Sequence, residues 1–204
     1  GQSILLITTW ISIIFISGIK ISYIFIILGL VFFFLFSLLI IFPEKFGYIF
    51  DRLIVFFDPT KGDSFQTDKA LAAIKQGGLK GQGMGEGILK DSVPEAHTDY
   101  IIAVITEEFG SIISIFVITI FLYISYKIIK TCIKISDENS KISLCGLSSL
   151  LIFQTFIHIG VNTSLLPTTG MTLPFLSYGG SSLIGSSILA GVILNFTKNR
   201  FKNE

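Results

Sequence analysis

Residues 21–42 read ISYIFIILGLVFFFLFSLLIIF, a run of apolar side chains that no charged residue interrupts. An α-helix needs about 20 apolar residues to cross the roughly 30 Å hydrocarbon core of a bilayer. This run is long enough, and Pro43 and Glu44 end it. The stretch therefore predicts a transmembrane helix and favours an integral membrane protein.

Further apolar runs lie on both sides of this helix. A shorter run precedes it across Gly18 and Lys20, and three more follow a long polar segment. Their approximate limits are 4–17, 100–129, 142–159 and 182–196. We therefore expect an all-α integral membrane protein with about five transmembrane helices, two within residues 1–43 and three within residues 100–204.

The composition supports this fold class. Of the 204 residues, 51% are hydrophobic and only 14% are charged, whereas about 25% are charged in an average soluble domain. The mean hydropathy of +0.77 excludes a disordered chain. The net charge of +1 gives no sign of a nucleic-acid-binding surface. Cys132 and Cys145 are too few for a disulfide framework, so we expect free thiols.

Residues 44–99 form the one large polar connection. Its first part, to Phe56, mixes aromatic and aliphatic side chains with charges that include Arg52, a pattern typical of an amphipathic segment at a membrane interface. Residues 68–76 (DKALAAIKQ) are good helix formers, and a Gly–Gly pair follows them. The glycine-rich stretch 77–87 fits neither a dinucleotide-binding nor a P-loop pattern. We expect a flexible surface loop there.

Basic residues in the short connections predict the orientation. They stand at positions 20, 127, 130, 134, 141, 198, 200 and 202. Cytoplasmic loops are enriched in Lys and Arg, and these connections alternate so as to share one side. Residues 44–99 and 160–181 then share the extracytoplasmic side. Two prolines and Gly170 in residues 160–181 predict an irregular, re-entrant-like outer segment.

Three ionisable residues cluster where the long loop meets the third apolar run. Glu95, His97 and Asp99 belong to the sequence VPEAHTDY, residues 93–100. A carboxylate at such a boundary loses water, which raises its pKa and suits a general base. The alternative is that Thr98 or Asp99 caps the N-terminus of the following helix. The two interpretations are compatible.

Two adjacent carboxyls, Glu107 and Glu108, follow inside the same predicted helix. Acidic residues within a membrane span are costly and usually functional. We expect one of them to face a cavity and the other a packed helix, or both to take part in a structural pairing.

Gln154 and His158 share one face of the fourth predicted helix because they are four residues apart. The only other histidine is His97, so a metal site is the weaker interpretation. Hydrogen bonds across helices are expected.

Four blocks of sequence identify a family resemblance. They are DRLIVFFDP (51–59), FQTDKALAAIKQGGLKGQGMGEG (65–87), VPEAHTDYIIAVITEEFG (93–110) and VNTSLLPTTGMTLPFLSYGGSS (161–182). The chain resembles the SEDS family of bacterial cell-envelope proteins, of the FtsW, RodA and SpoVE type, and is most similar to FtsW. The resemblance covers essentially all residues. It implies a single SEDS domain of about ten helices, of which this chain is the C-terminal half.

The resemblance implies peptidoglycan glycosyltransferase activity that polymerises lipid II into glycan strands during cell division. Asp99 is then the catalytic base that accepts the proton of the sugar hydroxyl. Other positions that match the family's motifs are expected to bind substrate or shape its cavity. These are Arg52, Gln66, Lys90, Glu95, His97, Glu107, Glu108, Asn162, Ser177, Gly179 and Gly180.

The resemblance also implies partners and a location. We expect lipid II and undecaprenyl pyrophosphate as ligands, and a class B penicillin-binding protein transpeptidase and other divisome proteins as partners. The location implied is the bacterial inner membrane, with several spans, at the division septum. No tightly bound cofactor is expected. A divalent cation, Mg²⁺ or Mn²⁺, would suit the pyrophosphate leaving group, although the sequence offers no complete set of metal ligands.

Two other functions compete with this one. A lipid II flippase would need a similar lipid-lined groove but no base at Asp99. A non-catalytic division scaffold would gain nothing from carboxyls placed inside the membrane. The three hypotheses therefore differ in what they require of Asp99.

Overall fold

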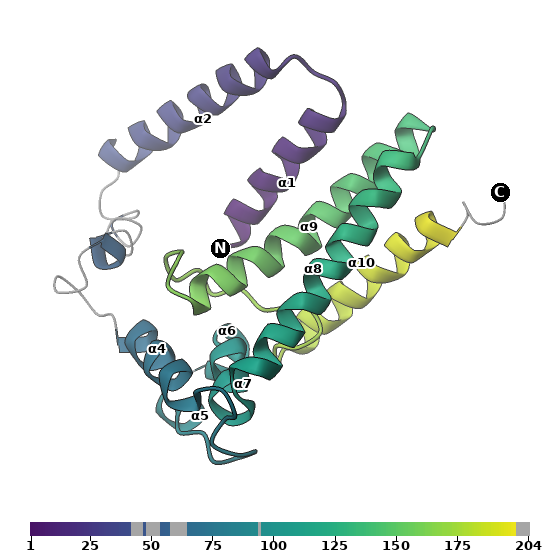
Figure 1. Ribbon diagram of the computed structural model, residues 1–204. Coiled ribbons are helices and arrows are strands. Elements are labelled where there is room, and N and C mark those ends of the chain that lie inside the picture. Colours follow the sequence, from purple (N-terminus) through teal and green to yellow (C-terminus); the bar gives the residue numbers. More distant parts are fainter. Residues whose placement is uncertain (42–46, 48–53, 58–64, 94, 199–204) are drawn as a thin grey trace.

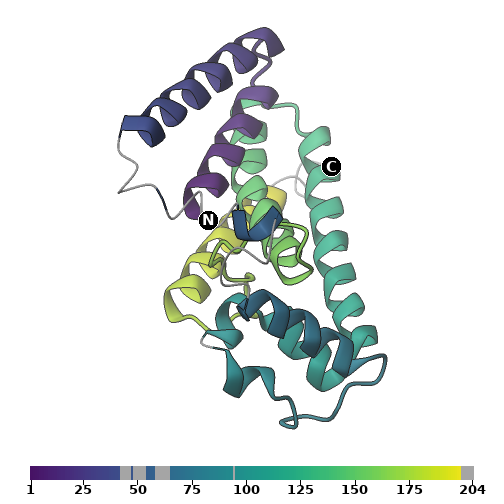
Figure 2. The same ribbon diagram turned by 90° about the vertical axis from the view of Figure 1, so that its left-hand side faces the viewer.

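The computed structural model describes residues 1–41, 47, 54–57, 65–93 and 95–198. The regular structure in these residues is helical, and it divides into long apolar helices and a cap of short helices at one end (Figures 1 and 2). The expected all-α membrane fold is confirmed. Of the residues of the predicted interfacial segment 44–56, only 47 and 54–56 are described, and Arg52 lies outside the described residues.

The apolar helices are α1 (Gln2–Ile16), α2 (Ile21–Ile41), α8 (Ser111–Lys134), α9 (Glu138–Asn162) and α10 (Gly180–Lys198). Among the described residues, α8, α9 and α10 are long and apolar enough to cross a membrane. Helix α1 has 15 residues, which agrees with the short first run of the sequence, and α2 has 21.

Helix α9 is the centre of the bundle, and α1, α8 and α10 all pack against it (Figure 1). Small residues make the approach of α1 close. A Cβ added at Gly146 would lie 3.0 Å from the side chain of Ile13, and Ser148 and Ser149 are buried nearby in the sequence. Without a hydrophobic driving force in lipid, such small residues allow the close packing that holds membrane helices together.

The connections and helix ends that contain the lysines lie at one end of the bundle. The turn between α1 and α2, the turn between α8 and α9, and the end of α10 are at the same end of the bundle (Figure 1), as the basic residues predicted. Asp137 caps α9 there by accepting a hydrogen bond from the Ser140 amide at 2.8 Å. Hydrogen bonds from Ser140 hold the pKa of Asp137 below its usual value. Cys132 and Cys145 are free, as expected, and buried.

The opposite end carries the cap, made of α4 (Phe65–Gly77), α5 (Leu89–Ser92), α6 (Ala96–Asp99) and α7 (Ile101–Phe109) (Figures 1 and 2). Their shared core contains Ala70, Ala73, Leu89, Ala96 and Ala103. Met171, from the segment between α9 and α10, and Leu5 of α1 pack against the same core. The cap is therefore fixed to the membrane helices.

The third predicted span is wrong in one respect, because it is not continuous. Helix α7 ends at Phe109, and Gly110, with φ 88° and ψ 165°, separates it from α8. Helix α7 packs against α4 in the cap. Glu107 and Glu108 therefore lie in a nine-residue helix of the cap, which is too short to cross a membrane, and not inside the continuous span that the sequence predicted.

Candidate functional site

Asp99 is the last residue of α6 and is half-buried. Helix α6 begins after Glu95, which takes a left-handed conformation with φ 61°. Helix α7 begins after Tyr100, and no side chain caps it. The N-cap position of α7 is therefore Tyr100, and the prediction that Thr98 or Asp99 occupies it is wrong.

The last turn of α6 is held by the end of α9 and by the chain between α9 and α10. The carbonyl oxygens of His97, Thr98 and Asp99 each accept a hydrogen bond. The donors are the Tyr178 amide at 3.0 Å, the Ser177 hydroxyl at 2.6 Å and the Asn162 side-chain amide at 2.9 Å. Carbonyls at a helix end otherwise lack partners, so this arrangement fixes the backbone that carries Asp99.

Asn162 is fully buried at the end of α9. Its Nδ2 also donates to the His158 carbonyl at 2.9 Å, and its Oδ1 accepts from the Ala103 amide at 3.1 Å. The side chain thus joins α9 to both α6 and α7. A buried amide with these bonds is not available to a ligand, so we correct its expected role from substrate contact to support.

Ser177 is buried and also committed to the protein. Its hydroxyl oxygen accepts from the Leu173 amide at 2.8 Å while it donates to Thr98. It therefore ties the segment 163–179 into a compact turn beside α6. It is not free to bind substrate.

Gly170 lies against the Asp99 carboxylate. A Cβ added at Gly170 would be 3.4 Å from Asp99 Oδ2, and the residue has φ 61°. The backbone of the segment 163–179 thus forms one wall of the Asp99 environment. The sequence predicted Gly170 only as a residue that breaks a helix. Its proximity to the Asp99 carboxylate had no signal in the sequence.

A second cluster holds the glycine-rich loop. The Glu107 side chain, 1% exposed, accepts hydrogen bonds from the amides of Ile88 at 2.9 Å and Leu89 at 3.0 Å. The amides of Gln82 and Gly83 donate to carbonyls of α7. Residues 78–80 and 84–86 are exposed, as expected of a surface loop. The loop is nevertheless anchored, because Gly77 and Gly81 pack directly on the backbone of α7.

Lys90 and Glu108 form an ion pair at the edge of this cluster. The Lys90 Nζ lies 3.3 Å from Glu108 Oε1 and 2.6 Å from the Gly85 carbonyl oxygen. The two side chains are 23% and 12% exposed. Lys90 is therefore partly accessible, and it already has an anionic partner.

Replacing Glu107 with Gln should lower the free energy of unfolding by about 2–3 kcal/mol, because an amide NH₂ would face a buried backbone donor. The matched change Glu108→Gln breaks only the partly exposed pair with Lys90 and should cost less than about 1 kcal/mol. Unfolding of the purified protein by SDS titration in mixed micelles measures both. Equal losses would show that Glu107 does not hold the loop.

The remaining predicted residues lie on the surface. Glu95, His97, Gln66 and Gly180 are exposed, and Gly179 is half-buried. The structure thus brings Asp99, Asn162, Ser177 and the His97 backbone together, with Glu107, Glu108 and Lys90 as a separate cluster. Within the described residues, no group of three or more His, Cys, Asp and Glu side chains is placed to hold a metal ion.

Gln154 and His158 bond outside their helix, as expected, but their partners belong to the irregular segment. Gln154 Nε2 donates to the Thr172 carbonyl at 2.9 Å. His158 Nδ1 lies 2.6 Å from the Met171 carbonyl oxygen. Both residues therefore attach the segment 163–179 to α9.

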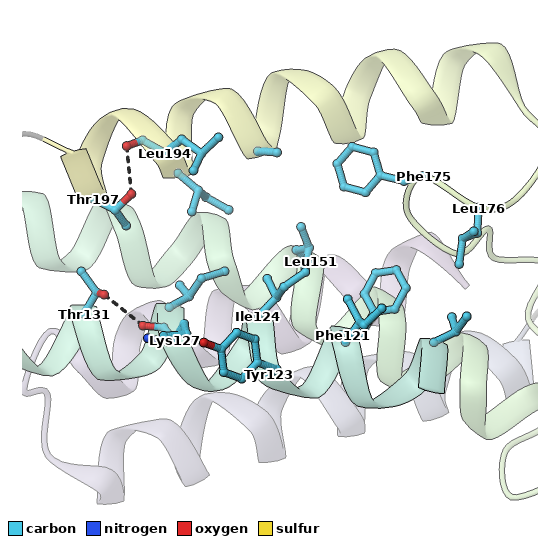
Figure 3. A pocket seen from close by; sticks show the side chains of 15 residues that line it. Phe121, Tyr123, Ile124, Lys127, Thr131, Leu151, Phe175, Leu176, Leu194 and Thr197 are labelled. Atoms are coloured by element: carbon cyan, nitrogen blue, oxygen red, sulfur yellow. Dashed lines mark hydrogen bonds between the residues drawn. The ribbon is translucent and has the colours of Figure 1, made fainter. Parts of the chain in front are cut away.

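An apolar groove with a volume of about 640 Å³ runs between α8 and α10 (Figure 3). Phe175 and Leu176 line one end, and Lys127, Thr131 and Thr197 line the other. Because Leu176 directly precedes Ser177, the first end of the groove adjoins the segment that supports α6. An apolar surface therefore leads along the bundle toward the Asp99 site.

The comparisons with known proteins agree with this architecture. The family model described as "Cell cycle protein" (FTSW_RODA_SPOVE) matches residues 1–202. A protein of Nitrosomonas europaea named "Probable peptidoglycan glycosyltransferase FtsW" is 36% identical over 100% of this chain and 54% of its own length. A protein of the same name from Caulobacter vibrioides is 38% identical over 76% of this chain and 40% of its own length.

A solved structure shares the fold. It comes from work titled "Structural coordination of polymerization and crosslinking by a peptidoglycan synthase complex", with a TM-score of 0.72 and 21% identity over 97% of this chain and 55% of that one. The chain spans about half the length of the curated relatives it matches. On the match of the family model and the identity to these relatives, the chain belongs to the FtsW, RodA and SpoVE family of cell cycle proteins.

Proposed function

We propose that the protein containing this chain is a peptidoglycan glycosyltransferase that polymerises lipid II during cell division. The observation that carries the proposal is the setting of Asp99. Its carboxylate is half-buried, and its backbone is fixed by Asn162. Partial burial suits a general base, and a rigid backbone suits a group that must meet a reacting hydroxyl. The names of the relatives support the same activity.

In the proposed reaction, Asp99 accepts the proton of the GlcNAc 4-hydroxyl of one lipid II unit. The freed oxygen attacks the anomeric carbon of MurNAc at the end of the growing strand. A new glycosidic C–O bond forms, and the C–O bond to undecaprenyl pyrophosphate breaks with its electrons leaving on the pyrophosphate. A carboxylate near the membrane interface suits a sugar that a lipid tail anchors there.

The surface residues supply the proposed contacts to substrate. His97 and Glu95 precede Asp99 by two and four residues and are exposed, so we assign them to the binding of sugar hydroxyls. Lys90 would share its charge between Glu108 and the pyrophosphate, and Arg52 would serve the same group. Gln66, Gly179 and Gly180 complete the proposed binding set. The apolar groove that ends at Phe175 and Leu176 suits the isoprenoid tail.

The described residues do not fit a resident metal ion, since they offer no cluster of ligands. We therefore assign no catalytic step to a protein-bound cation. Mg²⁺ or Mn²⁺ would arrive with the pyrophosphate that it neutralises.

The proposed setting is the bacterial inner membrane at the division septum, with a class B penicillin-binding protein that crosslinks the new strand and other divisome proteins. The structural neighbour comes from a peptidoglycan synthase complex, which supports a partner of this class.

Purified full-length protein with its transpeptidase partner tests the function. Incubation with lipid II should give glycan strands that separate by length on a gel, and these strands should disappear on digestion with a muramidase. Transport of lipid II across liposomes in the absence of strand formation would instead indicate a flippase. Neither activity, in a protein still needed for division, would indicate a scaffold.

A further inference from the structure

His158 is a buried histidine in α9 that the proposed reaction does not use. It is 1% exposed, and its Nδ1 lies 2.6 Å from the Met171 carbonyl oxygen. A carbonyl oxygen only accepts hydrogen bonds, so Nδ1 must carry the proton. In the neutral ring Nε2 is then an acceptor, and it has no hydrogen-bond partner within the described parts of the chain.

The bond to Met171 also fixes the neighbouring residue, Gly170. The backbone of Gly170 lies beside the Asp99 carboxylate, since a Cβ added at Gly170 would be 3.4 Å from Asp99 Oδ2. The position of the Met171 carbonyl therefore sets where this wall stands relative to Asp99.

The end of α9 also holds the backbone of Asp99. Asn162 is one helical turn after His158, and it donates both to the His158 carbonyl and to the Asp99 carbonyl. One helix thus fixes the backbone of Asp99 through Asn162 and the wall facing its carboxylate through His158.

We propose that His158 is a positioning residue for Asp99, in which the Nδ1 hydrogen of His158 holds the Met171 carbonyl and so keeps the Gly170 backbone against the Asp99 carboxylate. The proposal rests on the proposed function, because it assigns His158 to the placement of the base. His158 itself touches neither substrate nor the reacting atoms. The orphan Nε2 is not needed for this role.

Two substitutions of His158 distinguish the roles of its two ring nitrogens. In His158→Asn the side-chain NH₂ is bonded to Cγ, as Nδ1 is in histidine, so it can still donate to Met171. In His158→Gln the NH₂ lies one bond further out, near the position of Nε2, although glutamine fills the histidine volume better. A role in filling space favours Gln, whereas the proposed hydrogen bond favours Asn.

The measurement is lipid II polymerisation by the full-length protein with its transpeptidase partner. We expect His158→Asn to keep kcat within about threefold of the parent. His158→Gln should lower kcat by about 10- to 100-fold, the effect of a displacement of about 1 Å at a reacting group, with KM changed less than about threefold. Loss of activity in both variants, full activity in His158→Gln, or an effect on KM alone would overturn the proposal.

Hydrogen exchange gives a readout that does not depend on activity. The backbone amides of residues 168–173 should exchange faster in His158→Gln than in the parent, and at the parent's rate in His158→Asn. Equal exchange in all three proteins would overturn the proposed contact. A parent that makes no strands but shows this exchange pattern would remove the proposed function and the link to catalysis while retaining the contact.

Discussion

Replacing Asp99 with Asn should lower the rate of glycan-strand formation by about 100- to 10,000-fold, the contribution of a positioned general base. The substitution keeps the size of the side chain and removes its ability to accept the hydroxyl proton. It leaves the backbone in place, because Asn162 binds the Asp99 carbonyl and not its carboxylate. We therefore expect kcat to fall while the fold and the affinity for lipid II persist.

The control for this experiment is Asp91→Asn, which removes an exposed carboxylate eight residues earlier that has no assigned contact with substrate. It should reduce strand formation far less than Asp99→Asn does. Both variants should elute as the parent does in size-exclusion chromatography and should unfold at the same SDS concentration. A folded Asp99→Asn variant with parental activity would assign the base to another residue, and Glu108 would be examined next.

The helical membrane fold could be predicted because bilayer thickness imposes a length on apolar runs. The starts and ends of α9 and α10 fall within a few residues of the runs that predicted them. The break at Gly110 could not be found in this way. Helix α7 is apolar enough to continue into α8, but α7 packs against α4 in the cap, and the amides of Gly83 and Ser111 bond the glycine-rich loop to the junction of the two helices.

The candidate site could also be predicted only in part. Motif resemblance pointed to Asp99, and the polar sequence 93–100 alone marked the same place. Asn162 and Ser177 were also named, but as residues that bind substrate or shape its cavity. Asn162 bonds the Asp99 carbonyl and Ser177 bonds the Thr98 carbonyl. In each pair the two residues are more than 60 positions apart in the sequence. A single sequence contains no signal for such pairings, so support and contact could not be distinguished.

Gly110→Ala should be the most destabilising single substitution proposed for the cap, with an expected loss of about 3–5 kcal/mol in the free energy of unfolding. Backbone at φ 88° and ψ 165° is open essentially to glycine alone and costs other residues about 1–3 kcal/mol. An added Cβ would also overlap the carbonyl oxygen of Leu79 and lie 2.6 Å from the carbonyl carbon of Lys80. Overpacking of this kind costs about 1–3 kcal/mol more.

Two control glycines separate these causes. Gly78 has φ 54° but open space around an added Cβ, so Gly78→Ala should show the backbone strain alone, about 1–2 kcal/mol. Gly185 lies inside α10, also with open space, so Gly185→Ala should be neutral or stabilise by up to about 1 kcal/mol. SDS titration of the purified protein measures all three. If Gly110→Ala costs no more than Gly78→Ala, the contact between the glycine-rich loop and the start of α8 is loose. The cap would then be held mainly by Glu107, and Glu107→Gln would become the larger of the two losses.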